Sequence, residues 1–212
     1  MGKIISLVNQ KGGVGKTTTS INLAASLGIL GKKTLLVDLD PQGNATTGVG
    51  IEKGDLKVSL YDALIGAVEP SKSVKKTKFK NLDLIPSSMK LAGIEIEFVD
   101  KQHSDPTFSK GSQLKRVLYE IRDNYDYILI DCPPSLGVLT VNALTASDSV
   151  LIPVQCEYFA LEGIMQLLNT ITQARKNLNP KLEIEGVVLT MLDSRTNLGL
   201  EVVENVRGFF RE

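Results

Sequence analysis

A run of residues near the start of the chain combines glycine, lysine and threonine at the spacing of a phosphate-binding loop. It reads Asn9-Gln10-Lys11-Gly12-Gly13-Val14-Gly15-Lys16-Thr17-Thr18. Glycines let the backbone turn its N–H groups toward phosphate oxygens, and a helix that begins near Lys16 adds the positive end of its dipole. The spacing predicts that Lys16 reaches the β- and γ-phosphates of a nucleotide. It also predicts that the Thr17 hydroxyl binds Mg²⁺ and that Thr18 donates to an α-phosphate oxygen.

The loop departs from the standard P-loop pattern at two positions. That pattern has a glycine about five residues before its Gly-Lys pair, and Gln10 stands there instead. Lys11 is a second lysine that the standard pattern does not require. We predict a nucleotide-binding loop all the same, because the strand, loop and helix follow one another in the required order. Its members are Lys11, Gly12, Gly13, Val14, Gly15, Lys16, Thr17 and Thr18.

Acidic residues follow two further apolar runs. Asp38 and Asp40 end one run and Asp131 ends the other. Asp38 and Asp40 lie on the same side of an extended chain, and they come near the phosphates if their strand neighbours the first strand. One of them can help to hold the water around Mg²⁺, and the other can orient an attacking water. Asp131 is placed to hold the metal ion, through water, although an acid before two prolines can also cap a helix.

Short apolar runs alternate with longer amphipathic stretches along the chain. This alternation predicts an α/β fold, a doubly wound and mostly parallel sheet flanked by helices, with its ligand at the carboxyl ends of the strands. Helical periodicity at 161–174 and 198–209 predicts two amphipathic helices. The predicted strands cover 3–8, 33–38, 81–86, 127–131, 149–154 and 183–191.

Composition limits the classes of protein that the chain can represent. The 24 Lys and Arg residues balance 24 Asp and Glu residues, so nucleic-acid binding requires a local patch. The one obvious basic run, 69–80, has five lysines and is interpreted as a solvated surface loop. Cys132 and Cys156 are the two cysteines, and no apolar run has the length of a membrane span. These features predict a cytoplasmic protein with no membrane partner.

The motifs together resemble the ParA/Soj family of chromosome and plasmid partitioning ATPases, in the ParA/MinD group whose P-loop is called a deviant Walker A motif. The resemblance covers nearly the whole chain. It includes the loop at 9–18 and the segments 37–46, 130–137, 153–163 and 189–198. It implies a P-loop NTPase fold and an ATPase that uses Mg²⁺, converts ATP and water to ADP and phosphate, and turns over slowly without a stimulating partner.

The resemblance also implies a role for the surplus lysine. In this family two subunits form a homodimer around two ATP molecules, and the lysine that matches Lys11 reaches the nucleotide of the other subunit. The lysine that matches Lys16 is needed for nucleotide binding, and the acid that matches Asp40 positions the hydrolytic water. The ATP-bound dimer binds double-stranded DNA without sequence preference, on the nucleoid, until a ParB-type DNA-binding partner stimulates hydrolysis.

Two further candidates lie near the end of the last predicted strand, Met191 as its last residue and Arg195 in the loop that follows. Arg195 matches a DNA-contacting arginine in chromosomal members of the family. Met191 is placed either near the adenine or in the core. The chain stops at Glu212, where the family usually continues with a strand, an adenine-contacting turn and a helix. We therefore expect residues 1–212 to form a single P-loop ATPase domain that lacks that strand and helix.

Three alternative functions share parts of this pattern. A MinD-like membrane-associated positioning ATPase usually has glycine at the position of Gln10 and a basic amphipathic helix at its end. An iron–sulfur ATPase would use Cys132 and Cys156 as ligands, although both suit a buried structural role. A small-molecule ligase or kinase of the same fold would need a substrate pocket that the sequence does not identify.

Overall fold

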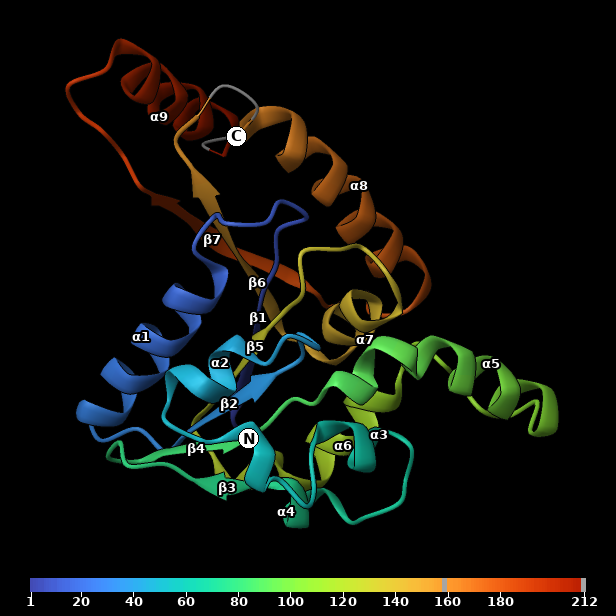
Figure 1. The fold of residues 1–212 in the computed structure, drawn as a ribbon. Coiled ribbons are helices and arrows are strands. Elements are labelled where there is room, and N and C mark those ends of the chain that lie inside the picture. Colours follow the sequence, from blue (N-terminus) through green and yellow to red (C-terminus); the bar gives the residue numbers. More distant parts are fainter. Residues whose placement is uncertain (158–159, 211–212) are drawn as a thin grey trace.

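The computed structural model describes residues 1–157 and 160–210 (Figure 1). Within this part of the chain, a 7-stranded sheet has the strand order β3-β4-β2-β5-β1-β6-β7. Its pairs are parallel except for β3 with β4, which confirms the predicted fold class. The strands are β1 (Lys3–Leu7), β2 (Thr34–Asp38), β3 (Lys75–Lys76), β4 (Leu82–Ile85), β5 (Tyr127–Asp131), β6 (Ser149–Gln155) and β7 (Glu183–Thr190).

Helices cover both faces of the sheet (Figure 1). Helices α1 and α2 lie on one face, and the larger helices that follow β4 lie on the other. The α-helices are α1 (Lys16–Ile29), α2 (Asn44–Gly48), α3 (Leu60–Leu64), α4 (Pro70–Ser73), α5 (Ile94–Ser104), α6 (Gln113–Ile121), α7 (Val138–Ala146), α8 (Ala160–Asn177) and α9 (Asn197–Phe209). The described residues also form the short 3-10 helices η1 (Lys53–Asp55), η2 (Met89–Gly93) and η3 (Arg122–Asn124).

The strands are apolar on both sides because both sides are covered. On β5, Leu129 packs into the core beneath α1, while Ile128 and Ile130 point into the larger core on the opposite face. All three side chains are 0% exposed. This burial explains why the runs are continuously apolar instead of alternating. The predicted helices at 161–174 and 198–209 are α8 and α9, although the side chains of Leu161 and Leu198 lie outside the described residues.

The basic run at 69–80 was the least accurate of the predicted segments. It is not a plain loop, because it contains helix α4 and edge strand β3. Strand β3 pairs antiparallel with β4 through Lys75 and Lys76. Two residues are too short to show the alternation from which a strand is recognised in a sequence.

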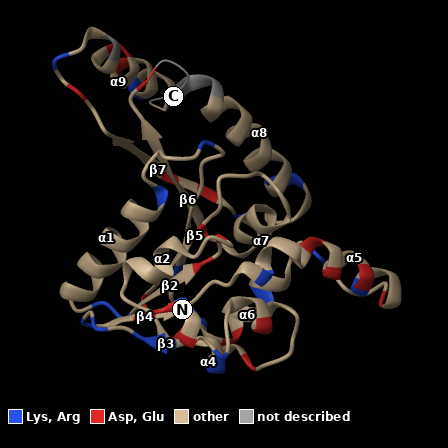
Figure 2. Ribbon diagram, in the orientation of Figure 1, with Lys and Arg blue, Asp and Glu red and all other residues tan. Residues whose placement is uncertain are grey.

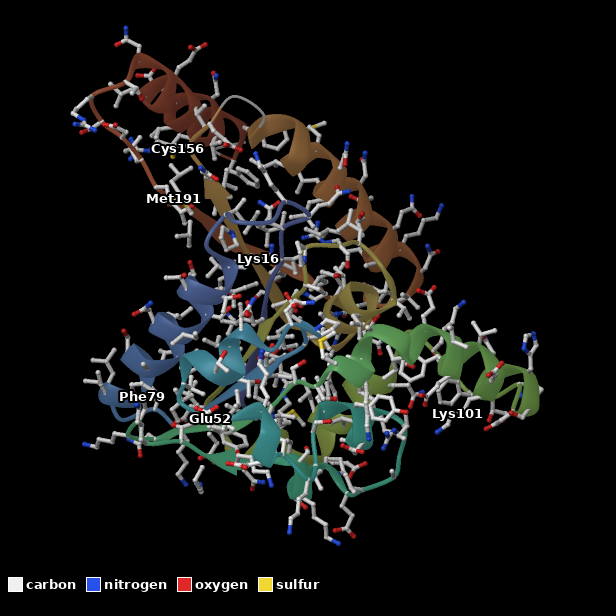
Figure 3. All side chains as sticks on the ribbon, viewed as in Figure 1. Lys16, Glu52, Phe79, Lys101, Cys156 and Met191 are labelled. Carbon is white, nitrogen blue, oxygen red and sulfur yellow. The ribbon has the colours of Figure 1, made fainter. Side chains whose placement is uncertain are left out.

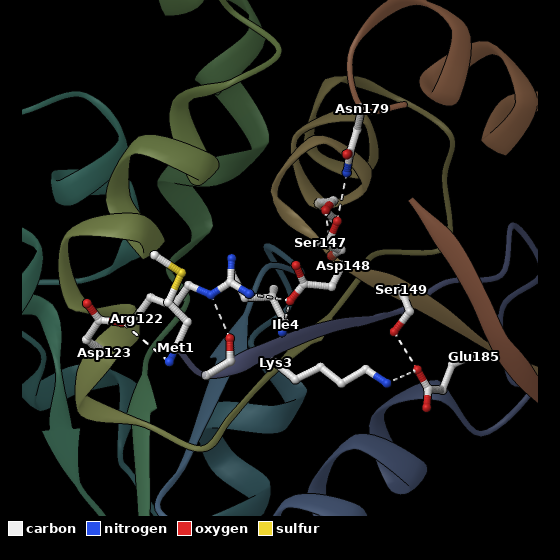
Figure 4. A network of polar contacts seen from close by, with 12 residues as sticks. Met1, Lys3, Ile4, Arg122, Asp123, Ser147, Asp148, Ser149, Asn179 and Glu185 are labelled. Carbon is white, nitrogen blue, oxygen red and sulfur yellow. Dashed lines mark hydrogen bonds and ion pairs between the residues drawn. The ribbon is translucent and has the colours of Figure 1, made fainter. Parts of the chain in front are cut away.

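A polar network fixes the amino ends of the central strands (Figure 4). Asp148, just before β6, accepts from the Ile4 backbone N–H at 2.8 Å and from Arg122 Nη2 at 2.6 Å. Arg122 Nε also donates to the Gly2 carbonyl at 2.6 Å. The network sets the position of β1, and therefore of the loop that follows it.

Asp38 and Asp40 were expected to come near the phosphates if their strand neighboured the first strand, and the strand order does not meet that condition. Strand β2 does not neighbour β1, because β5 lies between them. The register of β2 and β5 instead makes Asp38 and Asp131 direct neighbours. The chain moves from β1 to β2 on one side and later adds β6 on the other side of β1. Such a switch in strand order leaves a crevice at the carboxyl ends of the strands.

Candidate nucleotide site

The glycine-rich loop between β1 and α1 is held in a fixed shape by its first residue. Asn9 Nδ2 donates to the Pro153 carbonyl at 2.7 Å, and its Oδ1 accepts from the Lys11 N–H at 3.0 Å. Gly13 and Gly15 have φ of 76° and 85°, a left-handed conformation that residues with a Cβ seldom adopt. The loop is therefore anchored to β6 on one side, and its glycines are required by its backbone conformation.

A cleft of about 320 Å³ opens above this loop at the carboxyl end of the sheet. The described residues that line it come from the loop and α1, from the segments after β2 and β5, and from the position just after β7. They are Gly12, Gly13, Gly15, Lys16, Thr17, Thr18, Asp40, Asn44, Pro134 and Met191. The cleft thus brings together most of the predicted nucleotide-binding residues and the predicted catalytic acid.

Lys16 lies at the first turn of α1, inside the cleft (Figure 3). Its side chain is largely buried, and Nζ donates to the Lys11 carbonyl at 2.8 Å. Burial lowers the pKa of Lys16, while the nearby charge of Asp131 raises it. A buried ammonium group beside backbone N–H groups gives the cleft a strong preference for anions.

Asp131 and Thr17 are the two predicted metal ligands that the fold joins directly. Thr17 Oγ1 donates to Asp131 Oδ2 at 2.7 Å, and Ser20 Oγ donates to Oδ1 at 2.9 Å. Burial raises the pKa of Asp131 to about 6, although both hydrogen bonds act in the opposite direction. Ser20 was not predicted, and its position one helical turn after Thr17 is the signal that could have identified it.

Asp38 is fully buried and only half satisfied. Its Oδ2 accepts from the Thr46 N–H at 2.7 Å and from Thr46 Oγ1 at 2.6 Å. Among the described residues no donor reaches Oδ1. Burial raises the pKa of Asp38 to about 7, opposed by the hydrogen bonds from Thr46. The neighbouring Asp131 carboxylate raises it further. An unpartnered buried oxygen beside a second acid suits a bound cation and its water.

The side chain of Asp40 points in a different direction from that of Asp38. It lines the cleft, and its Oδ1 accepts from the Gln42 N–H at 2.9 Å. That bond forms a local turn that holds the carboxylate close to its own backbone. Asp38 is absent from the cleft lining among the described residues. The two acids therefore occupy different environments, although the sequence places them only two positions apart.

Lys11 does not point into its own cleft. Its ammonium group forms an ion pair with Glu157, which lies just beyond the end of β6. Both side chains are partly exposed, at 44% and 33%. Glu157 was not predicted, since nothing in its local sequence indicates a partner 146 positions earlier in the chain. Lys11 is at the rim of the loop, where another molecule can reach it.

The two candidates after β7 have different surroundings. Met191 has a φ of 53° and is 56% exposed at the rim of the cleft near Gly15. It is therefore not a core residue. Arg195 lies outside the cleft lining, and its guanidinium forms two hydrogen bonds with Asp193, at 2.9 and 2.8 Å. Hydrogen bonding to Asp193 raises the pKa of Arg195.

No group of three or more His, Cys, Asp or Glu side chains in the described ranges is arranged to hold a metal ion. A cation in this cleft would depend on one hydroxyl, carboxylates acting through water, and phosphate oxygens. That is the usual environment of Mg²⁺ in nucleotide sites, where the ion retains much of its water. Thr17, Asp131 and the unpartnered oxygen of Asp38 therefore fit Mg²⁺ together with a nucleotide.

A parallel sheet with a glycine-rich loop after its first strand and acids after two others defines a nucleotide-binding protein of the P-loop class. A family model described as an AAA domain matches residues 2–184. The chain is 60% identical, over its whole length, to the sporulation initiation inhibitor protein Soj of Bacillus subtilis, and covers 81% of that protein. It is 49% identical to the chromosome partitioning protein ParA of Myxococcus xanthus, again over its whole length, and covers 73% of it. The chain belongs to the ParA/Soj family of chromosome partitioning ATPases.

Solved structures give the same fold. A cobyrinic acid a,c-diamide synthase from Mycobacterium smegmatis, solved with an ATP analog and magnesium, superposes with a TM-score of 0.91 at 39% identity. That match covers 99% of this chain and 81% of the other. The septum site-determining protein MinD from Pyrococcus horikoshii, solved with Mg-ADP, has a TM-score of 0.75 at 26% identity, covering 95% and 77%. The ParA/Soj family thus fits this chain better than the MinD-like alternative.

Within residues 1–157 and 160–210, no helix is both long enough and apolar enough to cross a lipid bilayer.

Proposed function

We propose that this chain is an ATP-dependent switch for DNA segregation. In the ATP-bound state it forms a homodimer that binds double-stranded DNA without sequence preference and associates with the nucleoid. It hydrolyses ATP slowly by itself and faster when a ParB-type DNA-binding partner engages it. The observation that carries the proposal is the second loop lysine, Lys11, which is partly exposed on the loop and paired with Glu157 instead of pointing into its own cleft.

The decisive experiment compares DNA binding with ATP, ADP and no nucleotide, alongside the mass in solution. A dimer and DNA binding that both require ATP are the expected results. DNA binding that is equal in all three states would contradict the switch. Vesicle binding measured with the same samples tests the MinD-like alternative, which requires ATP-dependent association with lipid.

ATP and Mg²⁺ are the proposed ligands of the cleft. The N–H groups of residues 12–18 surround the phosphates, Lys16 contacts the β- and γ-phosphates, and Met191 lies by the adenine. Bound Mg²⁺ would neutralise charge on the phosphates during transfer of the γ-phosphoryl group. Thr17 supplies the hydroxyl ligand, while Asp38 and Asp131 hold the ion through water. The cleft lining supports the roles of the loop, Lys16, Thr17 and Met191, as does the ATP analog with magnesium in the solved synthase. The bond from Thr17 to Asp131 and the unpartnered Oδ1 of Asp38 support the roles of the two acids.

Lys11 makes closure of the dimer depend on ATP. To reach the nucleotide of a second subunit, its side chain must leave Glu157. A partly exposed ion pair contributes only about 0–1 kcal/mol, so the exchange is readily driven by the stronger attraction of phosphate oxygens. A cation supplied by the other subunit also stabilises negative charge that develops on the phosphates.

Lys11→Ala is expected to separate nucleotide binding from dimer formation. The variant should bind ATP as a monomer because Lys16 and the loop backbone remain. It should lose the ATP-dependent dimer and at least about tenfold in hydrolysis, since the cation supplied in trans is missing. Light scattering and a fluorescent ATP analogue measure the two properties. An ATP-dependent dimer of normal stability in Lys11→Ala would contradict the role across the interface. Lys32→Ala, which removes an exposed lysine after α1, is the matched control.

Two groups of cations are candidates for the DNA surface. Arg195 is exposed in the segment between β7 and α9, but its guanidinium forms an ion pair with the carboxylate of Asp193. Lysines instead gather at the β3 edge of the sheet, near α4, at the opposite end of the fold from α9 (Figure 2). We propose Arg195 as a DNA contact because of the family resemblance, with the lysines of 72–80 as the second candidate.

Arg195→Glu is expected to weaken ATP-dependent DNA binding about tenfold and to reduce the salt slope by about 1, as removal of one phosphate contact does. Basal ATP hydrolysis should change little, because Arg195 is outside the cleft lining. Titrations with DNA at several salt concentrations test this expectation. The control is Lys110→Glu, a charge reversal at an exposed lysine before α6. If Arg195→Glu binds like wild type while Lys75→Glu with Lys78→Glu does not, the surface lies at the β3 edge.

A further inference from the structure

A chain of hydrogen bonds connects the two acids at the end of β2, Asp38 and Asp40, to Ser87, which lies outside the segments that resemble the family. Its four members are Asp38, Asp40, Thr46 and Ser87, called here the acid clamp. They come from three segments: the end of β2 with the turn that follows it, helix α2, and the segment after β4. Thr46 and Ser87 are both 0% exposed.

The first half of the acid clamp holds Asp38. Thr46 donates its N–H and its hydroxyl to the same carboxylate oxygen, at 2.7 and 2.6 Å. With Oδ2 occupied twice, the Asp38 carboxylate has a fixed rotation. Its other oxygen, Oδ1, is left as the one without a donor among the described residues.

The second half holds the backbone of Asp40. The Thr46 hydroxyl accepts from the Ser87 N–H at 3.1 Å. Ser87 Oγ in turn donates to the Asp40 carbonyl, which also accepts from the Gly43 N–H at 2.8 Å. Thr46 therefore joins Asp38 to Ser87, and Ser87 joins this group to Asp40.

Asp40 needs such support because it lies beyond the regular sheet. Strand β2 ends at Asp38, and Leu39 makes a further backbone hydrogen bond to Asp131 at 3.0 Å. After that point, Ser87 ties the Asp40 backbone to the segment that follows β4. The Asp40 carboxylate bonds to the nearby Gln42 N–H, so its position follows that of its own backbone.

We infer that Thr46 and Ser87 are positioning residues for ATP hydrolysis, which hold Asp38 and Asp40 in place without touching the nucleotide themselves. The inference rests on the proposed function, in which Asp40 orients the attacking water. Neither residue lines the cleft among the described residues. Their loss should therefore change the rate of the chemical step and leave ATP binding intact.

Ser87→Ala is the first test, with kcat for ATP and the affinity for a slowly hydrolysed analogue measured together. Because misplacement of a catalytic group by about 1 Å can lower rates about a hundredfold, we expect kcat to fall at least about tenfold. The analogue affinity should stay within about twofold of wild type. Ser88→Ala is the matched control, since the adjacent Ser88 hydroxyl accepts from Ser59 Oγ at 3.1 Å, outside the acid clamp.

Thr46→Val and Thr46→Ser form the second test. Valine keeps the shape but removes the hydroxyl that serves both Asp38 and Ser87, whereas serine keeps the hydroxyl. We expect Thr46→Val to lower kcat at least as far as Ser87→Ala and Thr46→Ser to restore most of it. Thermal melting accompanies each variant, because a purely structural role would lower the melting temperature and leave the rate per folded molecule unchanged.

The outcomes separate this inference from the proposed function. If wild type hydrolyses ATP, Asp40→Ala does not, and both Ser87→Ala and Thr46→Val turn over at the wild-type rate, the positioning role is wrong and the proposed function stands. A wild-type protein without ATP hydrolysis would overturn the proposed function and with it the inference. An Asp40→Ala variant with full turnover would overturn the role of Asp40, and with it the inference, but would leave the ATPase itself in place. Reduced kcat with unchanged analogue binding and rescue by Thr46→Ser supports the positioning role.

Discussion

Lys16→Ala is expected to lose ATP binding, with an affinity about a hundredfold below that of wild type. Lys16 is a buried cation in the lining of the cleft, and it is the first residue of helix α1. A hydrogen bond to a charged group contributes about 1.5–3 kcal/mol, and about 3 kcal/mol corresponds to roughly a hundredfold in affinity. Alanine keeps the helix but supplies no cation. Titration with a fluorescent ATP analogue in the presence of Mg²⁺ measures the loss.

The same substitution also removes a structural contact, which the experiment must separate from the loss of charge. Lys16 donates to the Lys11 carbonyl and so helps to close the loop. Thermal melting without nucleotide reports on the loop and the fold, and addition of ATP reports on the site. Wild type should gain melting temperature with ATP and Lys16→Ala should not. Equal stabilisation of both proteins by ATP would mean that the nucleotide binds elsewhere.

The sequence was sufficient for every strand except the two-residue edge strand β3, and for the residues that each motif contains. Asp131 was identifiable as a candidate because a buried parallel strand is a continuous apolar run and its carboxyl end is marked by a polar residue. Lys16 and Thr17 were identifiable as candidates from the glycine-rich pattern before them. Thr17 and Asp131 are 114 positions apart, yet both were predicted to lie at the same metal site. Parallel strands deliver their carboxyl ends to one edge of the sheet, so motifs that follow strands meet there.

Tertiary contacts between motifs were not predictable in the same way. Nothing near Thr46 or Ser87 indicates that their hydroxyls meet, since the pairing depends on β4 lying beside β2. Glu157 has no local signal for its ion pair with Lys11. The insertion of β5 between β1 and β2 also has no signature in the sequence, because strand order depends on how the helices pack.

The different directions in which the Asp38 and Asp40 side chains point were also not predictable from the sequence. The alternation of an extended strand places both acids on one side, but the strand ends at Asp38. Beyond it the chain turns at residues 40–43, where the Gly43 N–H bonds to the Asp40 carbonyl. Asp38 therefore bonds to Thr46, while Asp40 faces the cleft. The alternation of a regular strand therefore does not apply to Asp40, which lies beyond the end of β2.

Asp40→Ala is expected to retain ATP and the dimer while hydrolysis falls about a hundredfold or more, the usual effect of removing a positioned acid or base. Binding should persist because Lys16, Thr17 and the loop backbone are unchanged. Hydrolysis should fail because Asp40 is the acid that lines the cleft without a bond to Thr17 or Thr46. Single-turnover hydrolysis, analogue binding and mass in solution test the three parts.

Asp40→Asn separates the charge of this residue from its place in the turn. The amide oxygen of asparagine can still accept from the Gln42 N–H, as Asp40 Oδ1 does. The backbone of the turn should therefore keep its conformation. If Asp40→Asn is as slow as Asp40→Ala, the carboxylate itself orients or activates the water. If Asp40→Asn is nearly as fast as wild type, the residue acts through the turn. Wild-type hydrolysis in both variants would transfer the role to another acid, and Asp38, with its unpartnered Oδ1, would be the next to replace.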